Sequence, residues 1–317
     1  MIDALKRVKA VQAKEAAWNE EHQFLDVRTP QAFTQLSGYL KFSQSAGGPV
    51  FYRGQRKLYG GRLVPSLLRP QTKQRRLVHC KQAEAIRRTN ELERYLEAAQ
   101  ASFLRGTPRP TWEPILQHYF LNTRWIDLVD SPWIALWFAC HELTLKDWGG
   151  DRLSHFRYSK RSFNDAINMT GGEPCSPLDG YAFVLLLQFG LLEPYVDDGV
   201  EQPGFFVTRG TTKSTPGYLV TDLRVAAPSL YLRPHAQQGM LAKRSAGGAH
   251  SNYDVSGAVI GAIGIRLDRA LDWLGGGHLL STASLFPAAT HDEGYRALIE
   301  KLPPPPECMG KLGLVGP

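Results

Sequence analysis

The stretches FYRGQ, at residues 51–55, and QHYFLNTRWIDLVDSPWIALWFA, at residues 117–139, decide how this chain is interpreted. Both place charged and amide side chains inside sequence that otherwise has the composition of a buried core. Ionic side chains are costly to bury unless they are paired. A strand ending in arginine and glycine suits the close approach of an anion, because glycine lacks a Cβ atom and guanidinium can bind phosphate through two hydrogen bonds. We therefore expect the functional site in these two stretches.

The composition is that of a globular protein with a sizeable core, since 43% of the 317 residues are hydrophobic. The formal net charge of +7 comes from an excess of arginine and lysine that is concentrated between Arg53 and Arg109. Two interpretations of this basic region stay open. It forms solvated helix faces, or it forms a surface for RNA, DNA or phosphate.

Cysteine and histidine spacing gives no sign of a metal site. The four cysteines, at positions 80, 140, 175 and 308, are far apart, which predicts free thiols, and His235 and His250 lack the spacing of metal ligands. No phosphate-binding glycine loop and no nucleophile elbow is present. The longest apolar run is too short to cross a bilayer, so we expect no membrane association and a cytoplasmic location.

Helix signals dominate the first half of the chain. Residues 3–19 have helical spacing, and Thr29 with Pro30 predicts the start of a second helix. The FYRG strand follows. Later elements are one or two amphipathic helices over 76–104, a short helix from Thr111 to Tyr119, a strand over 124–128, and a helix from Ser131 to about Leu143.

The second half contains mostly strand signals, so the predicted class is α+β with a mixed or antiparallel sheet core. Strands are expected over 181–189, 217–225, 239–243 and 258–267, and helices over 269–274 and 292–302, with a loop over 194–217. We divide the chain into a helical segment over 1–48, a main domain over 49–302 and a flexible tail over 303–317. Within the main domain, 76–110 is a basic helical insertion and 146–179 a loop or lid.

Together with RPHAQQGM, at residues 233–240, and SLFP, at residues 284–287, the two opening stretches resemble the FRG domain family over most of the chain. The family is named for an aromatic residue, arginine and glycine, here Tyr52, Arg53 and Gly54. Its second block has the pattern Q-H-(Y/F)-G-x-P-T-R-L-L-D-W-T followed by S-P. This chain keeps Gln117, His118, Tyr119, Thr123, Arg124, Asp127, Ser131 and Pro132. It has Phe120 in place of the glycine, Asn122 in place of the proline, and Val129 where an aromatic residue is common.

The FRG family has long been treated as functionally uncharacterised, but a weaker resemblance links the FYRG strand to the ADP-ribosyltransferases. That resemblance implies a transferase fold in which an Arg-Gly strand binds NAD, the strand leading to Ser131 is the second element, and Gln237 or Gln238 opens the third. It implies catalytic roles for Arg53, Asp127, Gln237 and Gln238. NAD, used as a substrate, would contact Tyr52, Arg53, Gly54, Gln55, Gln117, His118, Tyr119, Thr123, Arg124 and Ser131.

The hypothesis that follows is an NAD-dependent toxin or phage-defence effector that modifies a macromolecule, with nucleic acid preferred and a neutralising partner protein expected. The alternative is a non-catalytic FRG domain that binds nucleic acid or a nucleotide. Plainer interpretations stay open as well. Arg124 and Asp127 would form a buried ion pair that holds the fold, and His118 would be a hydrogen-bonded packing residue.

Overall fold

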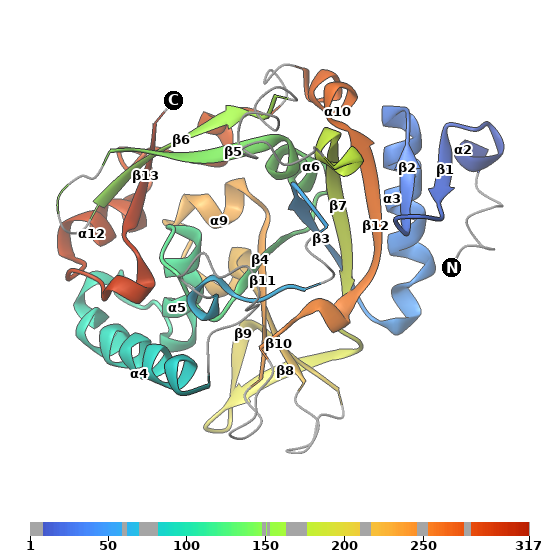
Figure 1. The fold of residues 1–317 in the computed structure, drawn as a ribbon. Helices are drawn as coiled ribbons and strands as arrows, with labels where there is room; N and C mark the ends of the chain where they lie inside the picture. Colours follow the sequence, from blue (N-terminus) through green and yellow to red (C-terminus); the bar gives the residue numbers. More distant parts are fainter. Residues whose placement is uncertain are drawn as a thin grey trace.

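The computed structural model describes residues 9–58, 62–69, 82–147, 150, 153–162, 176–209, 217–245, 253–275 and 280–316. These residues form two sheets with helices around them, a mixed α+β fold (Figure 1). The helices are α2 (Lys9–Gln12), α3 (Pro30–Ser43), α4 (Gln82–Ala98), α5 (Arg109–His118), α6 (Pro132–Cys140), α8 (Leu223–Ala226), α9 (Leu232–Ala236), α10 (Leu267–Trp273), α11 (Thr282–Leu285) and α12 (Glu293–Lys301).

The larger sheet has the strand order β1-β2-β12-β7-β3-β4-β11-β10-β9-β8. Its strands are β1 (Ala16–Asn19), β2 (Phe24–Val27), β3 (Val50–Gln55), β4 (Ile126–Val129), β7 (Tyr181–Gln188), β8 (Leu192–Asp197), β9 (Val200–Thr208), β10 (Tyr218–Asp222), β11 (Gly239–Arg244) and β12 (Val259–Arg266). Neighbouring strands run antiparallel, except β12 and β2, which run parallel. The sheet is therefore mixed.

The two halves of this sheet meet at β3 and β4. These strands share one paired position, Tyr52 opposite Val129, whereas β3 pairs with β7 from Val50 to Gln55. Beyond that position Nη1 of Arg53 donates a hydrogen bond to the backbone carbonyl of Asp127. A side chain thus connects the strands where their backbone pairing has ended, and the residues that follow Tyr52 border an opening in the sheet.

Helix α6 packs against β3 and β7 and fixes the need for glycine in the FYRG stretch. Ser131 caps the helix by accepting a hydrogen bond from the amide of Ile134 at 3.4 Å, and Pro132 occupies the first turn. A Cβ atom on Gly54 would lie 1.9 Å from the carbonyl oxygen of Ala135. Only glycine lets the helix backbone come this close. The close approach predicted for a ligand at Gly54 is thus made by a helix.

Helices α4, α5 and α12 lie on the opposite side of the molecule from α3 (Figure 1). Leu92 and Leu96 of α4, Leu116 of α5 and Leu298 of α12 share one apolar core. Nearby, the smaller sheet is built from β5 (His141–Asp147), β6 (Leu153–Lys160) and β13 (Leu312–Gly316), with β6 in the middle. The two sheets and this helical side surround the region of the FYRG strand.

Several predicted elements are confirmed. Thr29 caps α3 and accepts a hydrogen bond from the amide of Ala32 at 3.2 Å. The FYRG strand, the strand before Ser131, the helix after it and the four later strands all form, with ends shifted by a few residues. The predicted long helix is α4, although residues 76–81 lie outside the described residues. Of the four cysteines, Cys140 and Cys308 are free and buried, and the other two lie outside the described residues.

Other predictions were wrong. Residues 16–19 form strand β1 rather than helix, α5 starts at Arg109 with Pro108 as its cap, and α6 ends at Cys140 because the chain then enters β5. The expected loop over 194–217 contains most of β8 and all of β9. The expected loop or lid contains strand β6, and the expected flexible tail contains β13, which pairs with β6 from Leu312 to Gly316.

Candidate functional site

A cavity of about 850 Å³ lies beside the opening between β3 and β4. Its wall comes from β3 and the segment after it, the end of α5, strand β4, helix α6, the smaller sheet and the segments around Gln237 and Phe286. The polar lining residues are Arg53, Gln55, Arg56, Arg62, Ser66, Arg69, Gln117, His118, Asn122, Asp127, His141 and Gln237. Segments that are far apart in the sequence therefore meet around one cavity.

Charge on the cavity wall is strongly biased. Among the described residues that line it, Arg53, Arg56, Arg62 and Arg69 stand against a single carboxylate, that of Asp127. Arg56 forms an ion pair with Glu142, and Nε of Arg69 donates to the carbonyl of Val64 at 2.9 Å. Guanidinium groups hold phosphate and carboxylate ligands well. This side of the cavity is suited to an anion.

Asp127 is held in place by a short chain of hydrogen bonds. Nε2 of Gln117 donates to Oδ2 of Asp127 at 2.8 Å, and the hydroxyl of Thr123 donates to Oε1 of Gln117 at 2.7 Å. The amide of Trp125 donates in turn to the hydroxyl of Thr123 at 3.2 Å. Gln117 thus links the backbone after α5 to the carboxylate, which explains why a glutamine and a threonine accompany the aspartate in this stretch.

His118 is buried in the cavity wall, with 6% of its surface exposed. Its ring packs against Gly239, where a Cβ atom would lie 2.4 Å from Cε1 of the histidine. Neither ring nitrogen makes a hydrogen bond of acceptable geometry to a described residue, although the side chain of Gln237 lies close to the ring. Burial lowers the pKa of His118 to about 4, and Asp127 opposes that shift. The imidazole is therefore neutral near pH 7.

The two neighbouring glutamines take different positions. Gln237 is buried and lines the cavity, and its Nε2 donates to the carbonyl of Leu285 at 2.9 Å. Gln238 is exposed, is absent from the lining, and has a φ of 49° in the turn before β11. Of this pair, only Gln237 can act in the cavity.

The other end of the cavity is aromatic. Phe120, Phe138, Phe156, Tyr158 and Phe286 line it, and the rings of Phe120 and Phe156 stack with their centroids 5.2 Å apart. His141 lies here too. Its Nδ1 is 2.8 Å from the carbonyl of Trp137, and burial lowers its pKa. Flat apolar walls of this kind suit a planar heterocycle.

Phe120 and Asn122, which depart from the FRG pattern, contact the end of the chain. Phe120 has a φ of 77°, a left-handed conformation that favours glycine, and a Cβ atom on Gly313 would lie 2.3 Å from its ring. The backbone N–H of Asn122 donates to the carbonyl of Met309 at 2.7 Å. These two residues therefore dock the C-terminal segment, and the ring of Phe120 fills part of the aromatic end.

Arg124 does not line the cavity, and it does not pair with Asp127. Its guanidinium binds both carboxylate oxygens of Glu113, at 3.0 and 2.7 Å, and contacts Glu93 at 2.7 Å. Lys243 lies 3.4 Å from Glu113 on another side. Although burial opposes ionisation, Lys243 and Arg124 lower the pKa of Glu113 to about 2. The structure thus corrects both predictions for Arg124, since it lies outside the cavity lining where NAD was expected and its acid partners are glutamates rather than Asp127.

Four further candidates from the sequence have structural contacts. The hydroxyl of Tyr52 donates to the carbonyl of Ser37 at 3.0 Å, and burial raises its pKa to about 12. The hydroxyl of Tyr119 donates to Asp292 at 2.6 Å, away from the cavity lining. Ser131 is the cap of α6, and Thr123 acts on Asp127 through Gln117. Tyr52 alone among these four is part of the lining.

Sequence reasoning missed the cavity residues His141 and Tyr158, and it missed Arg233, which supports the wall from behind without lining the cavity. Arg233 is 1% exposed, its guanidinium carbon lies 4.4 Å from the centre of the Tyr119 ring, and Nη1 donates to the carbonyl of His118 at 2.8 Å. Its place between apolar residues was a usable signal. No signal marked Tyr158 or His141, because their strands were not expected to reach the site.

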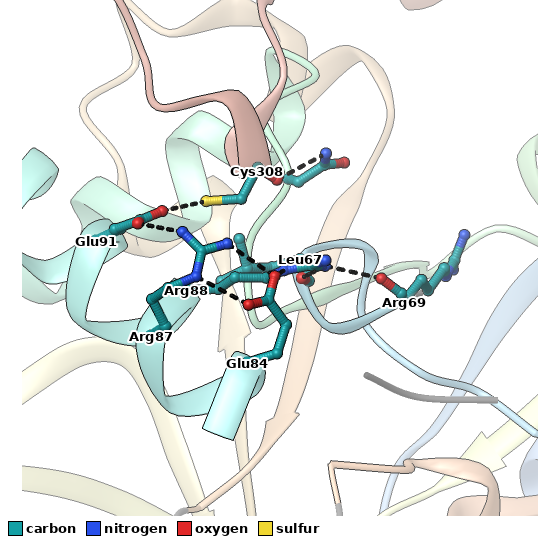
Figure 2. A network of polar contacts seen from close by, with 8 residues as sticks. Leu67, Arg69, Glu84, Arg87, Arg88, Glu91 and Cys308 are labelled. Atoms are coloured by element: carbon teal, nitrogen blue, oxygen red, sulfur yellow. Dashed lines mark hydrogen bonds and ion pairs between the residues drawn. The ribbon is translucent and has the colours of Figure 1, made fainter. Parts of the chain in front are cut away.

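Part of the basic region is neutralised by ion pairs where the structure describes it. In Figure 2, Arg87 and Arg88 of α4 point toward Glu84, and Arg88 also reaches the carbonyls of Leu67 and Arg69. Arg88 is buried, with Nε 2.6 Å from Glu84. Lys57 and Arg109 form ion pairs with Asp179 and Glu97 as well. Within the described part, α4 therefore presents mixed rather than purely positive charge.

These features define a mixed α+β protein with an arginine-lined, ligand-sized cavity at a break in its main sheet. Residues 48–147, which contain the arginine strand and most of the cavity wall, match the model of the FRG domain. The chain thus carries an FRG domain. Neither curated proteins nor solved structures gave a match. Among the described residues, no cluster of side chains could hold a metal ion, and no helix is long and apolar enough to cross a membrane.

Proposed function

We propose that this FRG-domain protein binds NAD in the arginine-lined cavity and transfers its ADP-ribose group to a macromolecule. The observation that carries the proposal is the cavity wall, on which four arginines face one carboxylate beside an aromatic end. NAD has matching parts, namely a diphosphate and a planar nicotinamide ring. A volume of about 850 Å³ falls in the range typical of cofactor sites.

In the proposed reaction, the bond between the ribose C1′ and the nicotinamide nitrogen breaks, and its electron pair leaves with neutral nicotinamide. A lone pair of the acceptor forms the new bond to C1′. The acceptor proton passes to the Asp127 carboxylate and then to water. Asp127 also stabilises the positive charge that develops on the ribose in the transition state. Arg53 and its neighbours hold the diphosphate, and the aromatic end receives the nicotinamide.

Nucleic acid is our preferred acceptor, because Arg62 and Arg69 line the cavity and are exposed. An activity of this kind inside a cell would arrest growth, so we propose a role as a toxin or phage-defence effector that is held in check by a partner protein. A non-catalytic nucleotide-binding domain is the competing function. It is favoured by Gln237, since an amide cannot neutralise positive charge as a carboxylate can.

The test is to incubate the purified protein with labelled NAD and, separately, with RNA, DNA and protein from cells, and to measure nicotinamide release and label transfer. We expect both for the wild type and neither for Arg53→Gln. The matched control is Arg266→Gln, which removes an exposed arginine paired with Asp268 at the end of β12. Binding of NAD without release would support the non-catalytic domain, and no binding would contradict both functions.

A further inference from the structure

One buried group in the cavity has no part in the proposed reaction. His118 is enclosed by the end of α5 and by Gly239, and its ring nitrogens lack partners of acceptable geometry among the described residues. A buried polar group without a hydrogen bond destabilises the fold, because it has lost its contact with water and gained no partner. His118 lines the cavity while both ring nitrogens are buried, so a ligand supplies the missing partner once the ring turns toward the cavity.

The charge state of His118 restricts what that partner can be. The charged groups that act on the ring are Asp127 of β4 and Arg233 of α9, and burial outweighs the effect of Asp127, so the pKa stays near 4. A neutral imidazole offers one donor and one acceptor and no charge. It is therefore a poor partner for phosphate and a good one for a hydroxyl group, which both donates and accepts.

The residues next to His118 have the same character. Nε2 of Gln237 donates to the carbonyl of Leu285, the side chain lies close to the His118 ring, and Asp127 offers carboxylate oxygens oriented by Gln117. Acceptors of this kind bind sugar hydroxyls, and the Asp127 carboxylate would repel a phosphate. The wall thus carries uncharged and acidic acceptors as well as guanidinium groups, and the two kinds meet where Arg53 donates to the carbonyl of Asp127.

We infer that His118, Gln237 and Asp127 form a subsite for the hydroxyl groups of a neutral sugar that is joined to a diphosphate. The ligand class is a nucleoside diphosphate sugar, and the ADP-ribose part of NAD belongs to it. This inference deepens the proposed function, and its placement of the ribose rests on that function. His118 would make the cavity prefer a sugar over a second anionic group at this position.

The experiment compares the dissociation constants of ADP-ribose and ADP by titration calorimetry. Both ligands carry the diphosphate, but only ADP-ribose carries the second sugar. We expect His118→Leu to reduce the preference for ADP-ribose over ADP about tenfold, as befits a lost hydrogen bond to a ligand. His118→Gln keeps a neutral donor and acceptor and should retain most of the preference. His155→Leu, an exposed position on the outer face of β6, is the matched control.

A second measurement needs no variant. The ring resonances of His118 in the wild type should shift when ADP-ribose is added and stay in place when ADP is added, and the ring should remain neutral between pH 6 and 8. An unchanged preference in His118→Leu, an equal loss of both ligands, or equal resonance shifts would overturn the subsite. Absent nicotinamide release would contradict only the transferase, because the preference for ADP-ribose is measured without turnover.

Discussion

Arg53 and Arg124 occupy similar places in the sequence pattern and opposite environments in the structure. Arg53 follows the single position at which β3 pairs with β4, donates through Nη1 to the backbone carbonyl of Asp127, and lines the cavity. Arg124 binds Glu113 and Glu93 and lies beside Lys243 in a buried cluster. The comparison shows that Arg124 is bound by carboxylates within the fold, whereas Arg53 bridges a break in the sheet and lines the cavity.

The largest expected effect is on the free energy of unfolding, when the buried cluster of Arg124, Glu113 and Lys243 is disrupted. Arg124→Ala should lower the free energy of unfolding by about 3–5 kcal/mol, because it leaves Glu113 buried with only Lys243 to balance its charge. Urea unfolding followed by circular dichroism measures this loss. Arg109→Ala, which breaks an exposed pair with Glu97, should have a much smaller effect. Equal losses in the two variants would remove the contrast between Arg53 and Arg124.

The next effect concerns pH. The folded-state pKa of Glu113, about 2, lies below the ordinary value of 4.5, so its ionised form stabilises the fold above pH 4.5. That stabilisation is lost as the pH falls from 4.5 toward 2. Glu113→Gln lacks it at every pH. The stability difference between wild type and this variant, about 2 kcal/mol or more at pH 6, should therefore shrink in acid. A difference that stays constant from pH 6 to pH 3 would contradict the assignment.

A smaller effect is expected at Arg53. Arg53→Gln should weaken ADP-ribose binding about tenfold or more, since a charge-assisted bond to phosphate is lost, and should change the free energy of unfolding by less than about 1 kcal/mol. Calorimetry and urea unfolding measure the two quantities on one preparation, with Arg266→Gln as the control. A variant with full affinity would show that Arg53 is structural, like Arg124.

The smallest effect is expected on α4. Arg87 is exposed and bonded to Glu84 and Glu91 of its own helix. Arg87→Gln should leave the midpoint of urea unfolding unchanged within error, in contrast to Arg124→Ala, because exposed ion pairs are screened by water and salt. A clear shift of the midpoint would show that exposure does not separate the two kinds of arginine in this protein.

What the sequence could predict was mostly local. Thr29 with Pro30 and Ser131 with Pro132 marked two helix starts, because capping depends on neighbouring residues alone. Long-range pairing gave no such signal. The proline-rich end was predicted to be flexible, yet β13 is held by β6, and nothing in either segment specifies the other. For the same reason, the aromatic end of the cavity was not predicted.

Within the candidate site, residue type was predictable and partner was not. The pattern placed Arg53, Gln117, His118, Asp127 and Gln237 in one site, and all five line the cavity. It also placed Arg124 there, whereas the structure pairs Arg124 with Glu113 of α5, an acid that nothing in the sequence marked as its partner. Gln237 is buried and Gln238 is exposed because of a single turn, and the amino-acid composition does not reveal the geometry of that turn.

The lone backbone pairing of Tyr52 with Val129 has a mechanical consequence. A continuous ladder of hydrogen bonds joins strands through the backbone alone, but β3 and β4 share a single rung. Phe51 of β3 lies in one apolar core with Ile126 and Leu128 of β4, so side chains do most of the work of holding these strands together. The shape of the cavity beside this junction therefore depends on packing more than on backbone pairing.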